Sequence, residues 1–317
     1  MRGAPDDSSA SRRVGAAALI TVVVCWGVVW PVNKVLLESF SPLWAIAARS
    51  AIATIALFGI ALARGRLVRP LRPDVPIVLS ITLLHIVGFG VLAAWGLHLV
   101  PTGRSVVLAY TTPLWVVPGA WLFLNERLTA RRITGVVVGL AGLVVLFNPT
   151  AFDWTSRAAV LGNGAILIGA LLWAASILHI RGHRWRSTPL DLVPWEMLLA
   201  TAIVMSLAFA VDGVPAVTWS VRLVALLLYA GIPGTAVAYW ATALASRNLP
   251  AVTTSLGLLA TPVLSVVVAT LWLGEPLTLA LVAAIILIPG GVAIGASPGD
   301  FVTKPLASAR RPGACSR

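Results

Sequence analysis

Charged residues are scarce in this sequence of 317 residues. Asp, Glu, Lys and Arg together make up 11% of it, hydrophobic residues make up 59%, and the mean hydropathy is +0.95. Soluble domains average roughly 25% charged residues, so this composition excludes an ordinary soluble fold. The apolar residues instead form runs of about 20, the length that a helix needs to cross ~30 Å of hydrocarbon. We therefore predict an all-α polytopic membrane protein whose surroundings are the lipid bilayer.

Residues that bind metals or form disulfides are also few. The chain has two cysteines and four histidines. Cys25 lies within an apolar run and Cys315 close to the end of the sequence, so no disulfide framework is expected. The sequence contains no His-Glu-x-x-His metal motif, no Gly-x-Ser-x-Gly nucleophile motif and no Walker A loop. We expect no metal, no cofactor and no built-in ATPase, and we do not expect an enzyme.

Positive charge is in excess, with a formal net charge of +12. The arginines do not form one basic face, as a nucleic-acid-binding protein would require, so no nucleic-acid partner is expected. Most of them lie in short clusters within alternate segments between the apolar runs. The other set of connecting segments holds only Lys34, Arg104, Arg157 and Arg222. By the positive-inside bias, both termini are predicted to be cytoplasmic.

Ten apolar segments are predicted to span the membrane. They cover residues 14–35, 42–63, 75–97, 102–123, 130–147, 159–180, 189–210, 221–245, 250–273 and 278–296. The first five spans form one repeat, residues 14–147, and the last five form a second, residues 159–296. Residues 1–13 and 297–317 are expected to be disordered cytoplasmic tails.

The two repeats share polar and proline residues at one constant offset. The matching pairs, all 149 residues apart, are Pro101 and Pro250, Thr112 and Thr261, Pro113 and Pro262, and Glu126 and Glu275. Because five is an odd number of crossings, the second repeat must lie upside down relative to the first. Inverted repeats of this kind are typical of secondary transporters, with the substrate site near the midplane between the halves. The alternative function is an intramembrane enzyme or a transport-inactive scaffold.

Several motifs add a family resemblance. They are Trp26-Gly-Val-Val-Trp-Pro-Val-Asn-Lys34, Arg49, Pro113 followed by Leu-Asn-Glu-Arg-Leu-Thr129, and Pro262 followed by Leu-Gly-Glu-Pro-Leu-Thr278. Together they resemble the EamA family of the drug/metabolite transporter superfamily, from about residue 14 to 296. The resemblance implies a ten-helix inner-membrane carrier with two EamA domains, which commonly exports amino acids or other small metabolites. Asn125 replaces the Gly usual in the first motif turn, which puts the tightness of that turn in question.

Two charged residues are predicted to lie within the membrane. Arg49 and Glu196 each follow a span-opening proline by seven residues, roughly 10 Å deep from opposite faces. About 10 Å would then separate them along the membrane normal, too far for a direct salt bridge. An Arg at a helix centre costs about 3 kcal/mol to insert, so Arg49 should face a partner or a wet cavity, with snorkelling to the interface as the alternative. The sharper hypothesis is a zwitterionic substrate, its carboxylate on Arg49 and its amine on Glu196.

Ring-bearing residues deep in the spans are further candidates for substrate binding. They are Trp26, Trp30, His85, Tyr110, Trp173 and Tyr239. Aromatic walls can hold apolar or cationic groups, whereas lipid-facing packing is the alternative for any one of them. His85 also suits proton coupling, because the unperturbed pKa of histidine is about 6.5. The alternative for His85 is a buried, neutral imidazole bonded to a backbone carbonyl.

Pro113 and Pro262 interrupt apolar spans at equivalent places and are predicted hinges, because a proline frees a backbone carbonyl. Glu126 and Glu275 are each expected to stabilise the N-terminus of the helix that follows them in sequence, with proton carriage as the alternative. Gly-x-x-x-Gly patterns at 135–139 and 291–295 let helices pack closely. They fit packing within one chain or between two, so both a monomer and a homodimer are compatible with the sequence.

Overall fold

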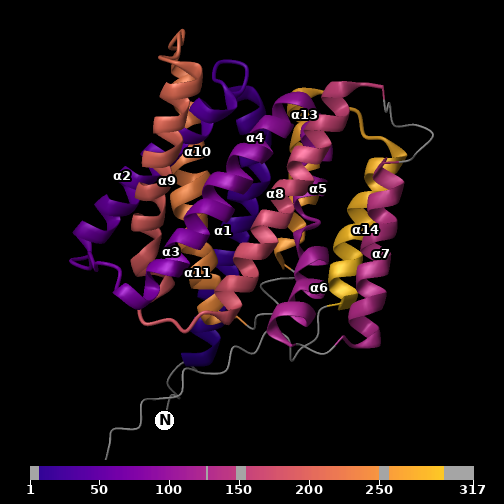
Figure 1. The fold of residues 1–317 in the computed structure, drawn as a ribbon, viewed down its shortest axis with the longest axis horizontal. Helices are drawn as coiled ribbons and strands as arrows, with labels where there is room; N and C mark the ends of the chain where they lie inside the picture. Colours follow the sequence, from indigo (N-terminus) through magenta and orange to yellow (C-terminus); the bar gives the residue numbers. More distant parts are fainter. Residues whose placement is uncertain (1–6, 126–127, 148–154, 250–256, 296–317) are drawn as a thin grey trace, which may run out of the picture.

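Helices and short connections make up the residues that the computed structural model describes, which are 7–125, 128–147, 155–249 and 257–295 (Figure 1). Among these described residues, seven helical stretches are long and apolar enough to cross a membrane. Two shorter apolar helices, α13 (Ala260–Leu273) and α14 (Leu279–Gly295), and the 18-residue helix α7 (Ala130–Phe147) complete the ten spans. The predicted all-α polytopic membrane fold is confirmed. Below, the face at which α1 begins is the tail side, and the opposite face is the far side (Figure 1).

The elements follow the predicted order closely. In the first repeat, spans 1, 2 and 5 are single helices, α1 (Asp7–Leu36), α2 (Pro42–Ala63) and α7. The third span consists of η1 (Arg72–Asp74), α3 (Val75–Ser80), η2 (Ile81–Phe89) and α4 (Gly90–Leu99). The fourth span consists of α5 (Thr102–Ala109) and α6 (Thr112–Leu124). The second repeat contains α8 (Arg157–Gly182), α9 (Pro189–Asp212), an eighth span of α10 (Val221–Gly231), η3 (Ile232–Val237) and α11 (Ala238–Asn248), then α13 and α14. Helix α1 starts earlier than predicted, since residues 7–13, assigned to a disordered tail, are helical. Residues 297–317 and the first part of the predicted ninth span lie outside the described residues.

Local sequence explains where many of these helices begin and end. Ser41, Ser156 and Ser220 precede α2, α8 and α10, and each serine hydroxyl accepts a hydrogen bond from a backbone N–H in the first turn. Helices α6 and α13 both end at a left-handed residue, Asn125 with φ 54° and Gly274 with φ 68°. Asparagine tolerates this conformation better than most residues do. Asn125 thus adopts the same left-handed conformation at the end of α6 as Gly274 does at the end of α13.

The two repeats also share their irregularities. In the third span and in the eighth, a π-helical segment interrupts the α-helix, η2 and η3 respectively. The fourth span breaks at Tyr110, and the ninth breaks at Leu259, which is the same place at the 149-residue offset. Wide or broken turns within apolar helices are commonly found at functional sites. In this bundle they occur at corresponding positions of both halves.

Helix pairing shows how the halves interlock. Spans that correspond to each other pack side by side, α2 on α9 and α7 on α14. Helix α1 packs on α11 and α13 of the second repeat, and α8 packs in the corresponding way on α4 and α6 of the first. Glu275 follows the end of α13 yet bonds to the start of α5, so the fourth and ninth spans run in opposite directions. The repeats are therefore inverted relative to each other.

Glycines draw α7 and α14 into backbone contact. A Cβ atom added at Gly135 would lie 2.5 Å from the carbonyl oxygen of Gly291 and 2.6 Å from the nitrogen of Gly295. Figure 1 shows these two helices side by side along one edge of the bundle. The Gly-x-x-x-Gly patterns thus serve packing within one chain, which was one of the two alternatives that the sequence allowed.

Candidate functional site

Five of the predicted substrate-binding residues form one continuous chain of ring contacts. The indole of Trp26 meets Tyr239 edge-on, with 6.1 Å between ring centroids. The imidazole of His85 lies 5.9 Å from Tyr239 and stacks on Trp173 at 5.0 Å, with only 10° between the planes. Tyr110 meets Trp173 edge-on at 6.3 Å. This ring chain draws on spans 1, 8, 3, 6 and 4, so both repeats contribute to it.

The irregular backbone explains why these rings meet. His85 lies within the π-helical segment η2, and Tyr239 is the second residue after the end of η3. Tyr110 stands at the break between α5 and α6. A π-turn holds one more residue than an α-turn and shifts the direction of the side chains that follow it. Three of the five rings therefore sit at the places where the regular helix is interrupted.

Phe89 extends the ring chain and was not predicted from the sequence. Its ring lies 4.9 Å from Trp173 and 6.0 Å from His85. The signal that could have identified it is its spacing, because residues four apart on a helix share a face, and Phe89 follows His85 by four. Trp30, which was predicted, makes no ring contact with this chain among the described residues. It packs between two of the core clusters instead, one around α2 and one around α5.

Arg49 stands beside the ring chain. Its side chain is half-buried on α2 and interacts electrostatically with both His85 and Tyr239. The Nε atom of Arg49 is buried and has no hydrogen-bond partner. A guanidinium group carries five N–H donors and loses free energy when a buried donor is left unpaired. The site therefore has a cation with one unpaired N–H donor, on Nε, next to its aromatic wall.

Glu196 is a second charged residue that interacts with Tyr239. It is only 3% exposed on α9, and Tyr239 interacts electrostatically with Glu196 as well as with Arg49. The backbone carbonyl of Glu196 accepts a hydrogen bond of 3.3 Å from Thr82 of the third span. No ion pair joins Arg49 to Glu196 in the described part of the chain, so the cation and the carboxyl group remain separate, with Tyr239 near both.

The predicted hinges lie at the broken spans. Pro113 is in the first turn of α6, directly after the break. The proline cannot donate to the carbonyl of Ala109, and the hydroxyl of Thr112 donates to that carbonyl instead, at 2.7 Å. Pro262 lies in the first turn of α13 and lines the same narrow gap as Tyr110. Both prolines thus adjoin the ring chain.

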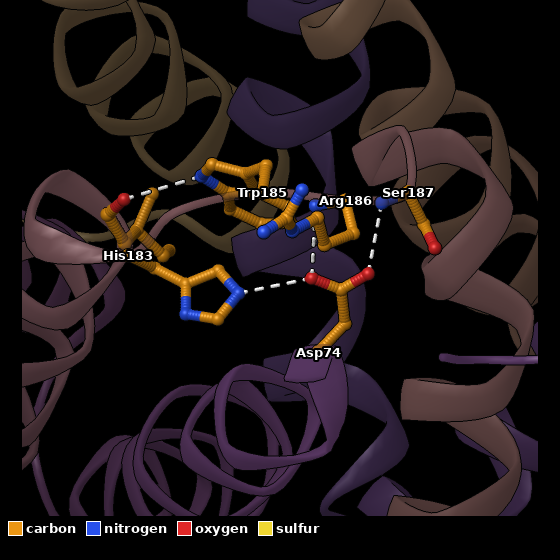
Figure 2. Close-up of polar contacts among 6 residues, drawn as sticks. Asp74, His183, Trp185, Arg186 and Ser187 are labelled. Carbon is orange, nitrogen blue, oxygen red and sulfur yellow. Dashed lines mark hydrogen bonds and ion pairs between the residues drawn. The ribbon is translucent and has the colours of Figure 1, made fainter. Parts of the chain in front are cut away.

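A second polar cluster ties the third span to the loop between α8 and α9 on the tail side, and sequence reasoning missed it (Figure 2). The carboxylate of Asp74 is fully buried and accepts three hydrogen bonds. His183 Nε2 donates to it at 3.0 Å, and the backbone N–H groups of Arg186 and Ser187 donate at 3.1 and 2.8 Å. We call these four residues the Asp74 clamp. Within the described ranges, no group of three or more His, Cys, Asp or Glu side chains could hold a metal ion.

Comparison with known proteins agrees with this geometry. A family model described as the EamA-like transporter family matches the chain twice, over residues 13–148 and 160–295. The chain belongs to this family. Its two EamA repeats are the two interlocked halves described above, and it is a multi-pass membrane transporter rather than an enzyme.

Individual relatives cover nearly the whole chain. It is 24% identical over 274 residues to the "Uncharacterized transporter YoaV" of Bacillus subtilis, covering 86% of this chain and 94% of the relative. It is 30% identical over 280 residues to the "Probable terminal-alkyne amino-acid exporter" of Streptantibioticus cattleyicolor, covering 86% and 90%. A solved crystal structure with 23% identity has a TM-score of 0.65 and covers 90% of this EamA chain and 96% of that chain. That last likeness concerns the fold alone.

Proposed function

We propose that this EamA transporter is a secondary exporter of small carboxylate-bearing metabolites, such as amino acids and related compounds. The observation that supports it best is Arg49, a half-buried cation with an unpartnered Nε beside the ring chain. The inverted repeats support alternating access, in which the site near the midplane opens to one side at a time. Export is the direction that fits the similarity to the named amino-acid exporter.

A carboxylate is the ligand that Arg49 accommodates best. The planar guanidinium group pairs with two carboxylate oxygens at once, and a charge-assisted hydrogen bond is about twice as strong as a neutral one. The bond is stronger still in the low-dielectric interior of the bundle. Without an anion, the buried Nε–H of Arg49 has no hydrogen-bond partner, which lowers the stability of the folded protein. A bound carboxylate therefore completes this part of the site.

The neighbouring groups set the rest of the substrate. The half-buried rings of Trp26, His85, Trp173 and Tyr239 offer an aromatic wall for an apolar or planar body, and ring faces also attract an amine. Glu196 interacts electrostatically with Tyr239 and provides a carboxyl group for that amine. His85 and Glu196 are the two titratable side chains at the site that could couple transport to a proton. The bound compound is thus a zwitterion with a hydrophobic side chain.

Sidedness follows from the arginine distribution. The tail-side segment between α2 and α3 holds Arg64, Arg66, Arg69 and Arg72. The tail-side segment between α8 and α9 holds Arg184 and Arg186. The positive-inside bias makes the tail side cytoplasmic. The protein then lies in the inner (plasma) membrane with both termini in the cytoplasm, and the far side is the side on which the exported compound is released.

Transport by purified protein in sealed vesicles tests this proposal. The panel compares amino acids that have apolar side chains with the matching carboxylic acids and amines, with and without a pH gradient. Arg49→Lys keeps the charge but loses the two-pronged fork, so it should weaken transport of every carboxylate while leaving amines little changed. Arg66→Lys, at an exposed site in the next loop, is the matched control.

Glu196→Gln should impair amine-bearing compounds more than plain acids. If Arg49→Lys lowers the transport of all compounds by one common factor, Arg49 does not recognise the carboxylate group of the substrate. If Glu196→Gln lowers the transport of all compounds equally, Glu196 is not an amine site, and a proton-coupling role of Glu196 would show itself as a lost response to the pH gradient. Wild-type vesicles that transport no member of the panel would contradict the proposed substrate class.

A further inference from the structure

Two charged side chains from distant spans hold the short turn between the third and fourth spans on the far side. Lys34, in the last turn of α1, donates its Nζ to the carbonyl of Leu97 at 2.6 Å and to that of Val100 at 2.9 Å. Both carbonyls belong to the end of α4, where backbone acceptors lack partners within the helix. A cation is favoured at a helix C-terminus by the helix dipole.

Glu275 binds the other side of the same turn. Its Oε1 accepts the N–H of Thr102 at 2.6 Å, and its Oε2 accepts the N–H of Gly103 at 2.9 Å. These two donors open α5, so the carboxylate occupies a helix N-terminus, where the dipole favours an anion. The sequence predicted such a role for Glu275, but at the helix that follows it. The structure corrects the partner, which is α5 of the other repeat.

Lys34 and Glu275 act on one unit. They interact electrostatically with each other, and both are half-buried. Gly103 leaves little space at this point, because an added Cβ would lie 3.0 Å from Leu281 of α14 and 3.3 Å from Val266 of α13. The far-side ends of spans 1, 3, 4 and 9 are thus joined by charge-assisted hydrogen bonds. We call Lys34, Glu275 and the turn from Leu97 to Gly103 the far-side clamp.

We infer that the far-side clamp is a gate of the transport cycle, which closes the far side and must break before that side opens. Spans 4 and 9 are the two that are broken, at Tyr110 and Leu259, and the clamp joins the far half of span 4 to the end of span 9. Bending at either break pulls on the clamp. Helix α5, with eight residues, is about 12 Å long and connects the clamp to Tyr110 of the ring chain. The inference rests on the proposed alternating access but not on the proposed substrate.

The test measures how easily the bundle opens on each side. Ser265 of α13 is fully buried, its hydroxyl has no hydrogen-bond partner, and Ser265→Cys is nearly isosteric. This reporter is placed in a chain whose two native cysteines are replaced. Sealed right-side-out and inside-out vesicles are then treated with a membrane-impermeant thiol reagent, and the reaction rate of the introduced thiol is compared between the two faces.

Glu275→Gln should raise the rate from the far side by about tenfold, which corresponds to ~1.4 kcal/mol. Removing the charge from one hydrogen-bonded partner is sufficient for an effect of that size. Lys34→Met should act in the same direction, and Lys34→Arg should restore slow labelling because it keeps the donors and the charge. Arg222→Gln, at an exposed site in the first turn of α10 on the far side, is the control and should not change the rate.

Unequal labelling from the two faces separates a gate from a merely structural contact. If Glu275→Gln speeds labelling equally from both faces, the residue only stabilises the fold, and the inference is wrong. Unchanged labelling in both Glu275→Gln and Lys34→Met would contradict it as well. No substrate is present in this assay, so a failed substrate panel and a failed gate can be told apart.

Discussion

The Asp74 clamp offers a quantitative prediction, because its carboxylate is fully buried and its three donors are all identified (Figure 2). Asp74→Asn keeps the shape but turns one oxygen into an N–H₂ donor. Asp74 Oδ1 accepts from His183 and Arg186, and Oδ2 accepts from Ser187. Asparagine can keep one of these oxygens only. At least one backbone N–H must then face another donor.

The magnitude follows from that count. A hydrogen bond to a charged group contributes about 1.5–3 kcal/mol, and the bonds that survive lose their charge assistance. We expect Asp74→Asn to lower the free energy of unfolding by about 2–3 kcal/mol. Asp74→Ala leaves all three donors without the carboxylate, and breaking a buried pair typically costs about 3–5 kcal/mol.

Thermal unfolding of the purified protein in detergent measures the effect. The midpoint of Asp74→Asn should fall by roughly 5 °C, and that of Asp74→Ala by more. Asp212→Asn is the matched control, because Asp212 also ends a span and bonds to a side chain, Ser41, but is exposed. Its midpoint should change much less. The reasoning is refuted if Asp74→Ala unfolds at the wild-type midpoint or if the two asparagine variants lose the same stability.

Three further predictions address topology, hinges and packing. In a cysteine-free background, Arg69→Cys should be shielded from an impermeant thiol reagent in intact cells and Asp212→Cys should be labelled; equal labelling would contradict the assigned sidedness. Pro113→Ala should slow transport at normal membrane levels, because the restored N–H lets the span straighten, and an unchanged rate would make Pro113 a packing residue only. Gly291→Ala should destabilise the protein by several kcal/mol, since its Cβ would lie 2.5 Å from backbone atoms of α7, whereas Gly290→Ala has open space and should be neutral or slightly stabilising by unfolding midpoint.

Much of the fold could be predicted because the relevant signals are local. Apolar runs locate the spans, and a constant offset identifies the repeats even where the apolar residues themselves carry little information. Five residues of the ring chain were singled out as candidates for a related reason. Tyr110 and Tyr239 are polar-tipped residues within otherwise apolar spans, and such residues are expected at a site rather than against lipid.

The contacts between spans were harder to predict. Glu275 was correctly assigned to a helix N-terminus, yet the sequence suggested the neighbouring helix, because nothing local indicates that α5 comes close. The Asp74 clamp joins residues that are 109 to 113 positions apart, and a lone aspartate before a span gives no hint of its partner. The π-helical segments were missed because their hydrophobic pattern resembles that of an α-helix over one or two turns. Glu126, the counterpart of Glu275, lies outside the described residues.

The exchange of neighbours between the two repeats has a consequence for biosynthesis. Helix α1 packs on α11 and α13, and α8 packs on α4 and α6, so each half supplies the first helix of the other half's core. Neither half is a closed folding unit. The helices of the first repeat are synthesised before their main packing partners in the second repeat. They must stay in the membrane without those contacts until the second repeat is inserted. Two half-length genes expressed together should therefore reconstitute one functional molecule, and either alone should be degraded or should pair with a second copy of itself in an antiparallel arrangement.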